Sequence, residues 1–157
     1  MLAICIPLLA LTAACDDDDD DVIPPPVEEP DLEFVDIELL GANERPTPVE
    51  TTGSGSLDAE YDDDTNILSY TVTWTLGNAE DETVAMHFHG PAGPDESAPP
   101  VITIDHGDGD YVGSVTAETD PLTAAQEADL KAGLWYINIH STTYSNGELR
   151  GQLIAED

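Results

Sequence analysis

Apolar and polar residues alternate in short stretches along most of the chain, from residue 32 to its end. The clearest stretch is ILSYTVTWTL (67–76), where large apolar residues take every second position and Ser or Thr fills the others. A period of two is typical of a β-strand with one buried face. In FVDIELL (34–40) the same pattern predicts Val35, Ile37 and Leu39 on one face. Eight strands are predicted, at residues 34–40, 55–61, 67–76, 83–89, 100–104, 111–118, 134–140 and 148–155.

One segment, LTAAQEADLKAG (122–133), has a helical pattern instead. Thr123 and Gln126 have the spacing of a capping box, and Gly133 suits the position just after a helix end. These signals predict a short helix over residues 124–132. Seven or eight short strands with one short helical crossover predict an all-β fold, an antiparallel β-sandwich or barrel.

The first 31 residues do not alternate in this way. Residues 1–14 (MLAICIPLLALTAA) are apolar and uncharged, and they are shorter than the roughly 20 residues that span a bilayer. They are typical of a signal peptide, and the ending LTAAC resembles a bacterial lipoprotein signal in which the cysteine is lipidated. We expect a signal peptide at 1–14, lipidated Cys15 with an acidic, Pro-rich tether at 15–31, and a folded domain at 32–157.

This reading predicts a protein of the bacterial cell envelope, anchored by lipid to the outer membrane and facing the periplasm or the outside. The membrane partner is then the lipid anchor at Cys15. The alternative is an ordinary cleaved signal peptide followed by an incidental cysteine.

The charge of the chain limits its partners. It contains 34 acidic and 3 basic residues, for a formal net charge of −31. Such a chain repels nucleic acids and anionic lipid headgroups, so a charge-driven partner would be a cation or a basic protein. Because the only two cysteines are Cys5 and Cys15, the predicted domain has no internal disulfide.

Four motifs occur in a fixed order along the predicted domain. They are LLGANERPTPVETTGSGS (39–56), HFHGPAG (87–93), LTAAQEADLKAGLWYINIHS (122–141) and NGELRGQL (146–153). Together they resemble the CHRD domain, which is named from chordin and also found in bacterial secreted proteins. The resemblance covers roughly residues 34–155 and implies an all-β extracellular domain without an established activity. The recurrent positions of the family correspond to Glu44, Pro46, His87, His89, Gly90, Pro91, Asn138, His140, Gly147, Glu148, Arg150 and Gly151.

Three histidines are candidate metal ligands. His87 and His89 are two residues apart on one predicted strand, so they point to the same face. His140 lies near the end of another strand, and three converging imidazoles would suit Zn²⁺ or Cu²⁺. The alternative is structural, since buried imidazoles also donate hydrogen bonds that fix loops against a sheet.

Two further groups of charged residues are candidate sites. Arg150 is expected to form a structural ion pair with Glu44 or Glu148, or else to hold an anionic ligand. In the loop DHGDGD (105–110), Asp105, Asp108 and Asp110 offer hard oxygen ligands for Ca²⁺, although an acidic hairpin loop has the same composition.

The sequence therefore favours an envelope-anchored binding or structural module of the CHRD type, without expected catalysis. The alternative is a metalloprotein in which His87, His89 and His140 hold Zn²⁺ or Cu²⁺, with an enzymatic role left open. No P-loop, Rossmann glycine pattern or thiol-redox pair is present in the sequence.

Overall fold

The computed structural model describes residues 31–156 and consists of eight strands, one α-helix and one 3-10 turn in this part of the chain. The predicted segments of residues 1–14 and 15–30, including Cys15, lie outside the described residues. The elements are β1 (Leu32–Leu40), η1 (Gly41–Asn43), β2 (Ser54–Asp62), β3 (Ile67–Thr75), β4 (Thr83–His89), β5 (Pro100–Thr103), β6 (Val112–Glu118), α1 (Ala124–Lys131), β7 (Tyr136–Ser141) and β8 (Leu149–Gln152).

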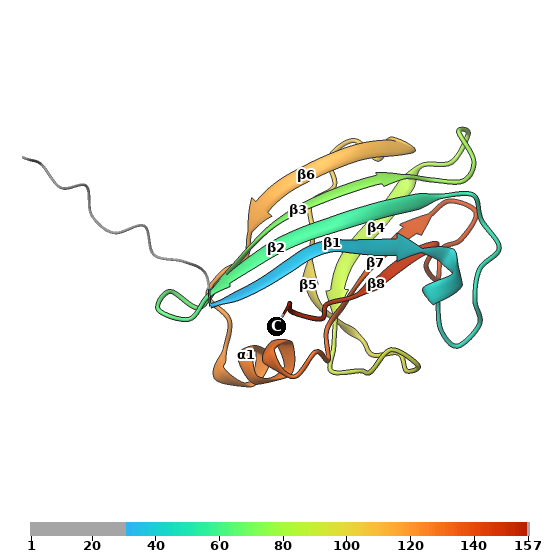
Figure 1. Cartoon of the computed structure of the whole chain (residues 1–157). Helices are drawn as coiled ribbons and strands as arrows, with labels where there is room; N and C mark the ends of the chain where they lie inside the picture. The colour runs from blue at the N-terminus through green and yellow to red at the C-terminus, as the bar shows by residue number, and fades with distance from the viewer. Residues whose placement is uncertain (1–30, 157) are drawn as a thin grey trace, which may run out of the picture.

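The eight strands form one antiparallel sheet in the order β5-β4-β7-β8-β1-β2-β3-β6. The sheet curls into an open half-barrel, with β6, β3 and β2 along one wall and β4, β7 and β8 along the other (Figure 1). The expected all-β antiparallel fold with one helical crossover is confirmed.

The concave side of the curled sheet contains the apolar core. On β3 the alternation is as predicted, because Leu68, Tyr70, Val72 and Trp74 are all buried. The two walls meet across the core, where the Tyr70 ring packs edge-on against Phe88 of β4 at 5.1 Å between centroids. These contacts explain how a sheet with two open edges still encloses a core.

Strand β1 differs from its predicted pattern. Phe34 is buried whereas Val35 is 43% exposed, so Val35 does not share the inner face with Leu39. The reason is a β-bulge between Phe34 and Ile37, where Asp36 adopts a positive φ of 51°. The Asp36 N–H then donates to Oδ1 of Asp58 (2.9 Å), and the extra residue reverses the faces of the residues before it.

Helix α1 connects β6 to β7 and agrees with the prediction. Thr123 accepts from the Gln126 N–H, and the Gln126 side chain accepts from the Thr123 N–H, so the capping box is complete. Leu130 packs into the core, and Gly133 ends the helix with a φ of 68°. Within residues 31–156, none of the helical structure has the length and apolar character required to cross a bilayer.

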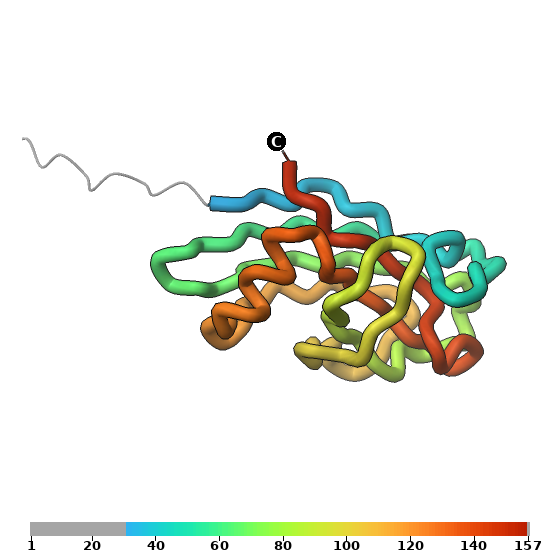
Figure 2. Tube along the Cα trace, turned by 90° about the horizontal axis from the view of Figure 1, so that it is seen from below, coloured from blue at the N-terminus to red at the C-terminus, as the bar shows by residue number. Residues whose placement is uncertain are grey.

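Strand β7 is buried on both faces, which is unusual for a sheet with one apolar side. Ile137 and Ile139 face the core, and Tyr136 and Asn138 on the opposite face are also buried. Loops cover this second face. The loop between β4 and β5 lies over β7 and β8 (Figure 2), where Ala92 accepts a hydrogen bond from Gln152 (2.9 Å). The result is a polar layer on the convex side of the sheet.

Candidate metal centre

The register of β4 and β7 brings the three predicted histidines together. His87 pairs with Asn138 and Ala85 pairs with His140, so His140 lies diagonally across from His87 on the same face. His87 Nδ1 and His140 Nε2 are 3.4 Å apart. His89 completes the group, and one ring nitrogen from each histidine lies within 4.8 Å of the others. We call His87, His89 and His140 the histidine trio.

Hydrogen bonds to the main chain orient two of these rings. His89 Nδ1 lies 2.9 Å from the Ala98 carbonyl oxygen, and His140 Nδ1 lies 3.1 Å from that of Ser145. A carbonyl oxygen can only accept, so Nδ1 carries the proton in both rings and Nε2 carries the lone pair. The Nε2 lone pair of His140 accepts from His87 Nδ1, and that of His89 has no partner among residues 31–156. Histidines that bind metals usually donate their other N–H in this manner.

The Nε2 atom of His89 is buried and has no hydrogen-bond partner among residues 31–156. A buried polar atom without a partner is costly, and it is rare in native proteins. A bound cation would satisfy this lone pair.

The spacing of the trio is close to that of a coordination shell. Two imidazole nitrogens bound to one tetrahedral Zn²⁺ at about 2.0–2.1 Å would lie about 3.4 Å apart. The His87–His140 separation of 3.4 Å already has this value. Because the whole group lies within 4.8 Å, small side-chain rotations would bring the third nitrogen to the same distance.

The electrostatics of the trio favour the neutral imidazole. Burial lowers the pKa of His87, His89 and His140 below the ordinary value. The charge of His106 further lowers the pKa of His87. The hydrogen bond that His89 donates to the Ala98 carbonyl oxygen partly offsets the effect of burial on the pKa of His89. Neutral imidazoles bind a metal ion without first losing a proton.

An aromatic and cationic stack supports the trio. The His89 ring stacks on Tyr136, with centroids 4.8 Å apart and planes inclined by 10°. The Arg150 guanidinium lies over the same tyrosine, 3.7 Å from its centroid. The Tyr136 hydroxyl donates to the Ala98 carbonyl oxygen (3.1 Å), which also faces His89. The stack therefore fixes both the His89 ring and the loop that orients it.

The expected ion pair of Arg150 with Glu44 or Glu148 is not present among the described residues, whose ion pairs involve Arg45 and Lys131. Arg150 instead donates to the Gly93 carbonyl oxygen and the Gln152 side chain, both at 3.2 Å. Its guanidinium stacks on Tyr136 and bonds to this loop, with no direct contact to either carboxylate among the ion pairs of residues 31–156.

Both carboxylates have other partners. Glu148 lies just before β8, and its Oε1 accepts from the Thr51 hydroxyl (2.7 Å) and the Gly77 N–H (2.8 Å). Glu44 accepts from the Asn138 amide with both oxygens, each at 3.0 Å. Burial raises the pKa of Glu44 to about 7, and the Asn138 hydrogen bond and the Arg150 charge lower it only in part. Glu44 is thus a proton-binding group next to the strand that carries His140.

The three candidate calcium ligands do not form a group close enough to share an ion. Asp105, Asp108 and Asp110 are exposed, and Asp105 Oδ1 accepts the Gly107 N–H (3.0 Å) within the loop. Across residues 31–156, the histidine trio is the group of acidic, His or Cys side chains placed closely enough to share an ion. The geometry therefore gives no support to a calcium site in this loop.

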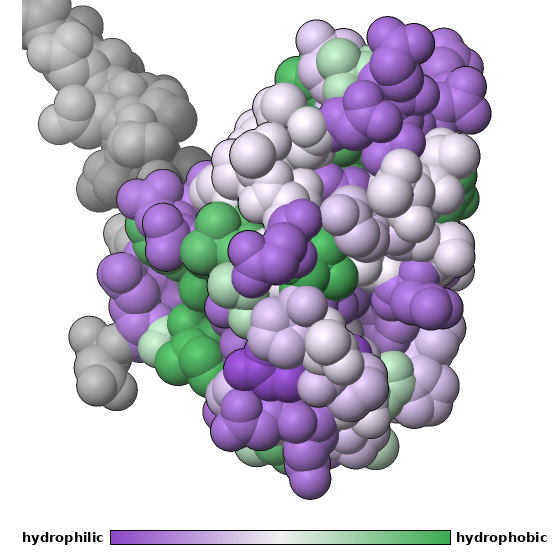
Figure 3. All heavy atoms as spheres, turned by 90° about the vertical axis from the view of Figure 1, so that its right-hand side faces the viewer, coloured by the Kyte–Doolittle hydropathy of each residue, from purple (hydrophilic) through white to green (hydrophobic). Residues whose placement is uncertain are grey.

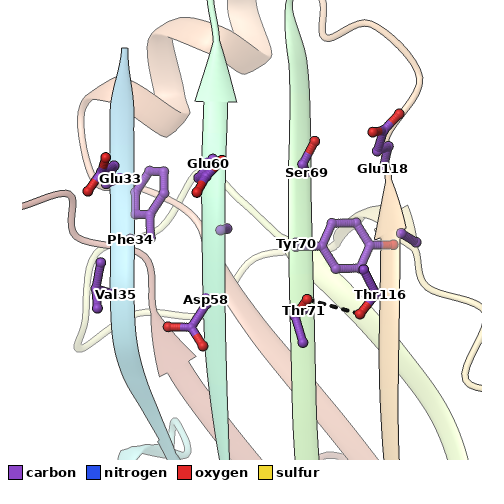
Figure 4. Close-up of a pocket in the computed structure, with 12 residues that line it drawn as sticks. Glu33, Phe34, Val35, Asp58, Glu60, Ser69, Tyr70, Thr71, Thr116 and Glu118 are labelled. Carbon is purple, nitrogen blue, oxygen red and sulfur yellow. Dashed lines mark hydrogen bonds between the residues drawn. The ribbon is translucent and has the colours of Figure 1, made fainter. Parts of the chain in front are cut away.

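A shallow hollow of about 780 Å³ lies on the wall formed by β1, β2, β3 and β6 (Figure 4). Four acidic residues line it, namely Glu33, Asp58, Glu60 and Glu118. A hydrogen bond of 3.0 Å joins Thr71 and Thr116 across its floor. At the end of the molecule seen in Figure 3, hydrophilic residues gather at the margins around a smaller hydrophobic area. Neither surface groups metal-ligating side chains as the trio does.

The sequence reasoning missed the role of Tyr136. A signal was present, because Tyr136, Asn138 and His140 alternate with Ile137 and Ile139 on one strand. Such alternation indicates a polar face, but only the structure shows that loops bury this face.

Comparison with known families supports the resemblance found in the sequence. A family model described as the CHRD domain matches residues 35–153, a range that contains the whole trio. No curated protein and no solved structure matches the chain.

Proposed function

Because the chain belongs to the CHRD domain family, we propose that it is an extracytoplasmic binding module whose ligand is a transition-metal ion, Zn²⁺ or Cu²⁺. The histidine trio would hold the ion through one nitrogen of each ring. The observation that carries this proposal is the state of His89, whose Nδ1–H donates to the Ala98 carbonyl oxygen while its buried Nε2 has no hydrogen-bond partner among residues 31–156. Imidazole nitrogens suit zinc and copper better than calcium or magnesium.

The second candidate is a purely structural role for the trio. The same hydrogen bonds attach the loops at Ala98 and Ser145 to the sheet, and they would do so without a metal. The unpartnered Nε2 of His89 favours the metal-binding role, because a structural histidine gains nothing from a buried, unsatisfied nitrogen.

Equilibrium dialysis against Zn²⁺ and Cu²⁺, followed by elemental analysis, tests the proposal. Excess Mg²⁺ in the buffer occupies the many exposed carboxylates of this acidic chain. We expect one ion per chain, and a loss of more than about tenfold in affinity in His87→Ala and in His89→Gln. Glu60→Gln, which removes a charge from the acidic hollow, is the matched control and should bind like the wild type.

Two results would favour the structural role instead. One is wild-type protein that retains no more metal than a variant with all three histidines replaced. The other is a His89→Gln variant that binds normally and shows only a lower melting temperature. Circular dichroism of each variant separates loss of binding from loss of fold.

We further propose that a lipid at Cys15 anchors the domain to the envelope, with residues 16–31 as the tether. The apolar run that ends directly before Cys15 supports this, as does the acidic, Pro-rich stretch after it. In membrane fractionation, the wild type should remain with the membranes and Cys15→Ser should be released. Equal partition of the two proteins would contradict the anchor and would leave the metal proposal untouched.

A further inference from the structure

The chain contains four histidines, and three of them form the trio. His106 follows β5, which lies beside β4 in the sheet, and Thr103 of β5 pairs directly with His87. We propose that His106 is the fourth protein ligand of the same metal ion, so that four imidazoles close the centre. This inference rests on the proposed metal-binding function.

The first support is the state of the His106 ring. Its Nδ1 atom is buried and has no hydrogen-bond partner in the described part of the chain. Buried ring nitrogens usually have a partner, as Nδ1 of His89 and Nδ1 of His140 do. His106 therefore has a buried ring nitrogen that a bound metal ion would satisfy.

The second support is the position of the loop beside β4. Thr103 pairs with His87, so the chain enters the loop of His106 next to the trio. The charge of His106 is among the causes that lower the pKa of His87, which agrees with this position. The main chain leads to the same conclusion, since the Ile104 N–H donates to the Met86 carbonyl oxygen (2.9 Å) and holds the start of the loop beside β4.

The loop that carries His106 has to move for the ring to reach the ion, because His106 lies outside the group whose nitrogens are within 4.8 Å. Gly107 has a φ of 73°, and nothing lies within 4 Å of the position of a Cβ there. The far end is held where the Thr83 N–H donates to the Gly109 carbonyl oxygen (2.8 Å). Open space therefore lies beside Gly107, between these two anchors.

The surroundings of His106 suit a cation. Asp105, Asp108 and Asp110 are in the same loop and are exposed. Their charges would attract a divalent ion and balance part of its charge after binding. A site with four protein ligands has no position for a substrate, which is the arrangement of zinc sites that hold an ion rather than catalyse a reaction. The closed centre thus favours a binding module over a metalloenzyme.

Titration of the protein with Co²⁺ tests the fourth ligand, because the visible absorption of Co²⁺ reports its coordination number. We expect an intense tetrahedral spectrum for the wild type. His106→Ala should weaken Co²⁺ binding by at least about tenfold and give the weaker absorption of a five- or six-coordinate ion. Asp108→Asn, in the same loop, is the matched control and should keep the tetrahedral spectrum.

The outcomes separate the two proposals. If His106→Ala binds Co²⁺ with unchanged affinity and spectrum, His106 is not a ligand and the trio alone forms the site. If the wild type binds no Co²⁺ while Mg²⁺ is in excess, both this inference and the metal-binding function are overturned. If His106→Gln and His106→Ala both lose the tetrahedral spectrum and keep wild-type circular dichroism, the inference is supported.

Discussion

The buried carboxyl of Glu44 gives a measurable dependence of stability on pH. Burial raises its pKa from the ordinary 4.5 to about 7, and its side chain is buried against Asn138. Below pH 4.5 the carboxyl is protonated in the folded and unfolded states and has no differential effect. Between pH 4.5 and about 7 the unfolded state ionises first, so the free energy of unfolding falls as the pH rises. Each pKa unit corresponds to about 1.4 kcal/mol, so the full loss is about 3 kcal/mol above pH 7.

Glu44→Gln removes this loss, because the glutamine is neutral at every pH and its Oε1 can still accept from Asn138. Relative to wild type, the variant should gain about 2–3 kcal/mol in free energy of unfolding between pH 5 and pH 8. Urea unfolding with a chelator present measures this difference, followed by the fluorescence of Trp74 and Trp135, which are both buried. Glu60→Gln removes the same charge from the surface and controls for the general repulsion in an acidic chain. A constant difference between Glu44→Gln and wild type across this pH range would refute the reasoning.

Three other predictions follow from single contacts. A Cβ at Gly113 would clash with the Trp74 ring, so Gly113→Ala should lower stability by about 1–3 kcal/mol in urea unfolding, while Ser114→Ala should change it little. Thr123→Ala removes the capping box with Gln126 and should cost about 1 kcal/mol; an unchanged melting temperature would show that α1 does not depend on its cap. Metal affinity should fall by clearly less than about sixfold between pH 7.5 and 6.5, because three imidazoles with the ordinary pKa would lose about sixfold and those of the trio have lowered pKa values. Isothermal titration at the two pH values checks this, and a fall of about sixfold or more would contradict it.

The strands and the helix could be read from the sequence because their signals are local. The alternation in β3 and the capping box of α1 each depend on residues a few positions apart. The convergence of His87 and His89 with His140 was predictable as a possibility, since two of them share a strand face. The three histidines meet because β4 pairs with β7. This pairing is a long-range contact, which the sequence alone does not specify.

The errors have a common physical cause. In β1 the bulge at Asp36 changes which residues face inward, and a one-residue insertion leaves no clear trace in the hydrophobic pattern. The partners of Arg150 depend on the loop at Gly93, whose path is set by tertiary contacts. In both cases the deciding contact lies far away in the sequence, so local patterns could not indicate it.

The open edge of the half-barrel affects how copies of this protein behave at high concentration. Among residues 31–156, β6 pairs with β3 on one side only, so its other row of main-chain groups is free for another strand. Many proteins guard such an edge with lysine or proline, and the sequence VGSVTAE of β6 contains neither. Mutual repulsion between chains of net charge −31 provides a different protection. Acidification toward the isoelectric point near 4.1 would remove that repulsion, and strand-to-strand aggregation would then begin at β6.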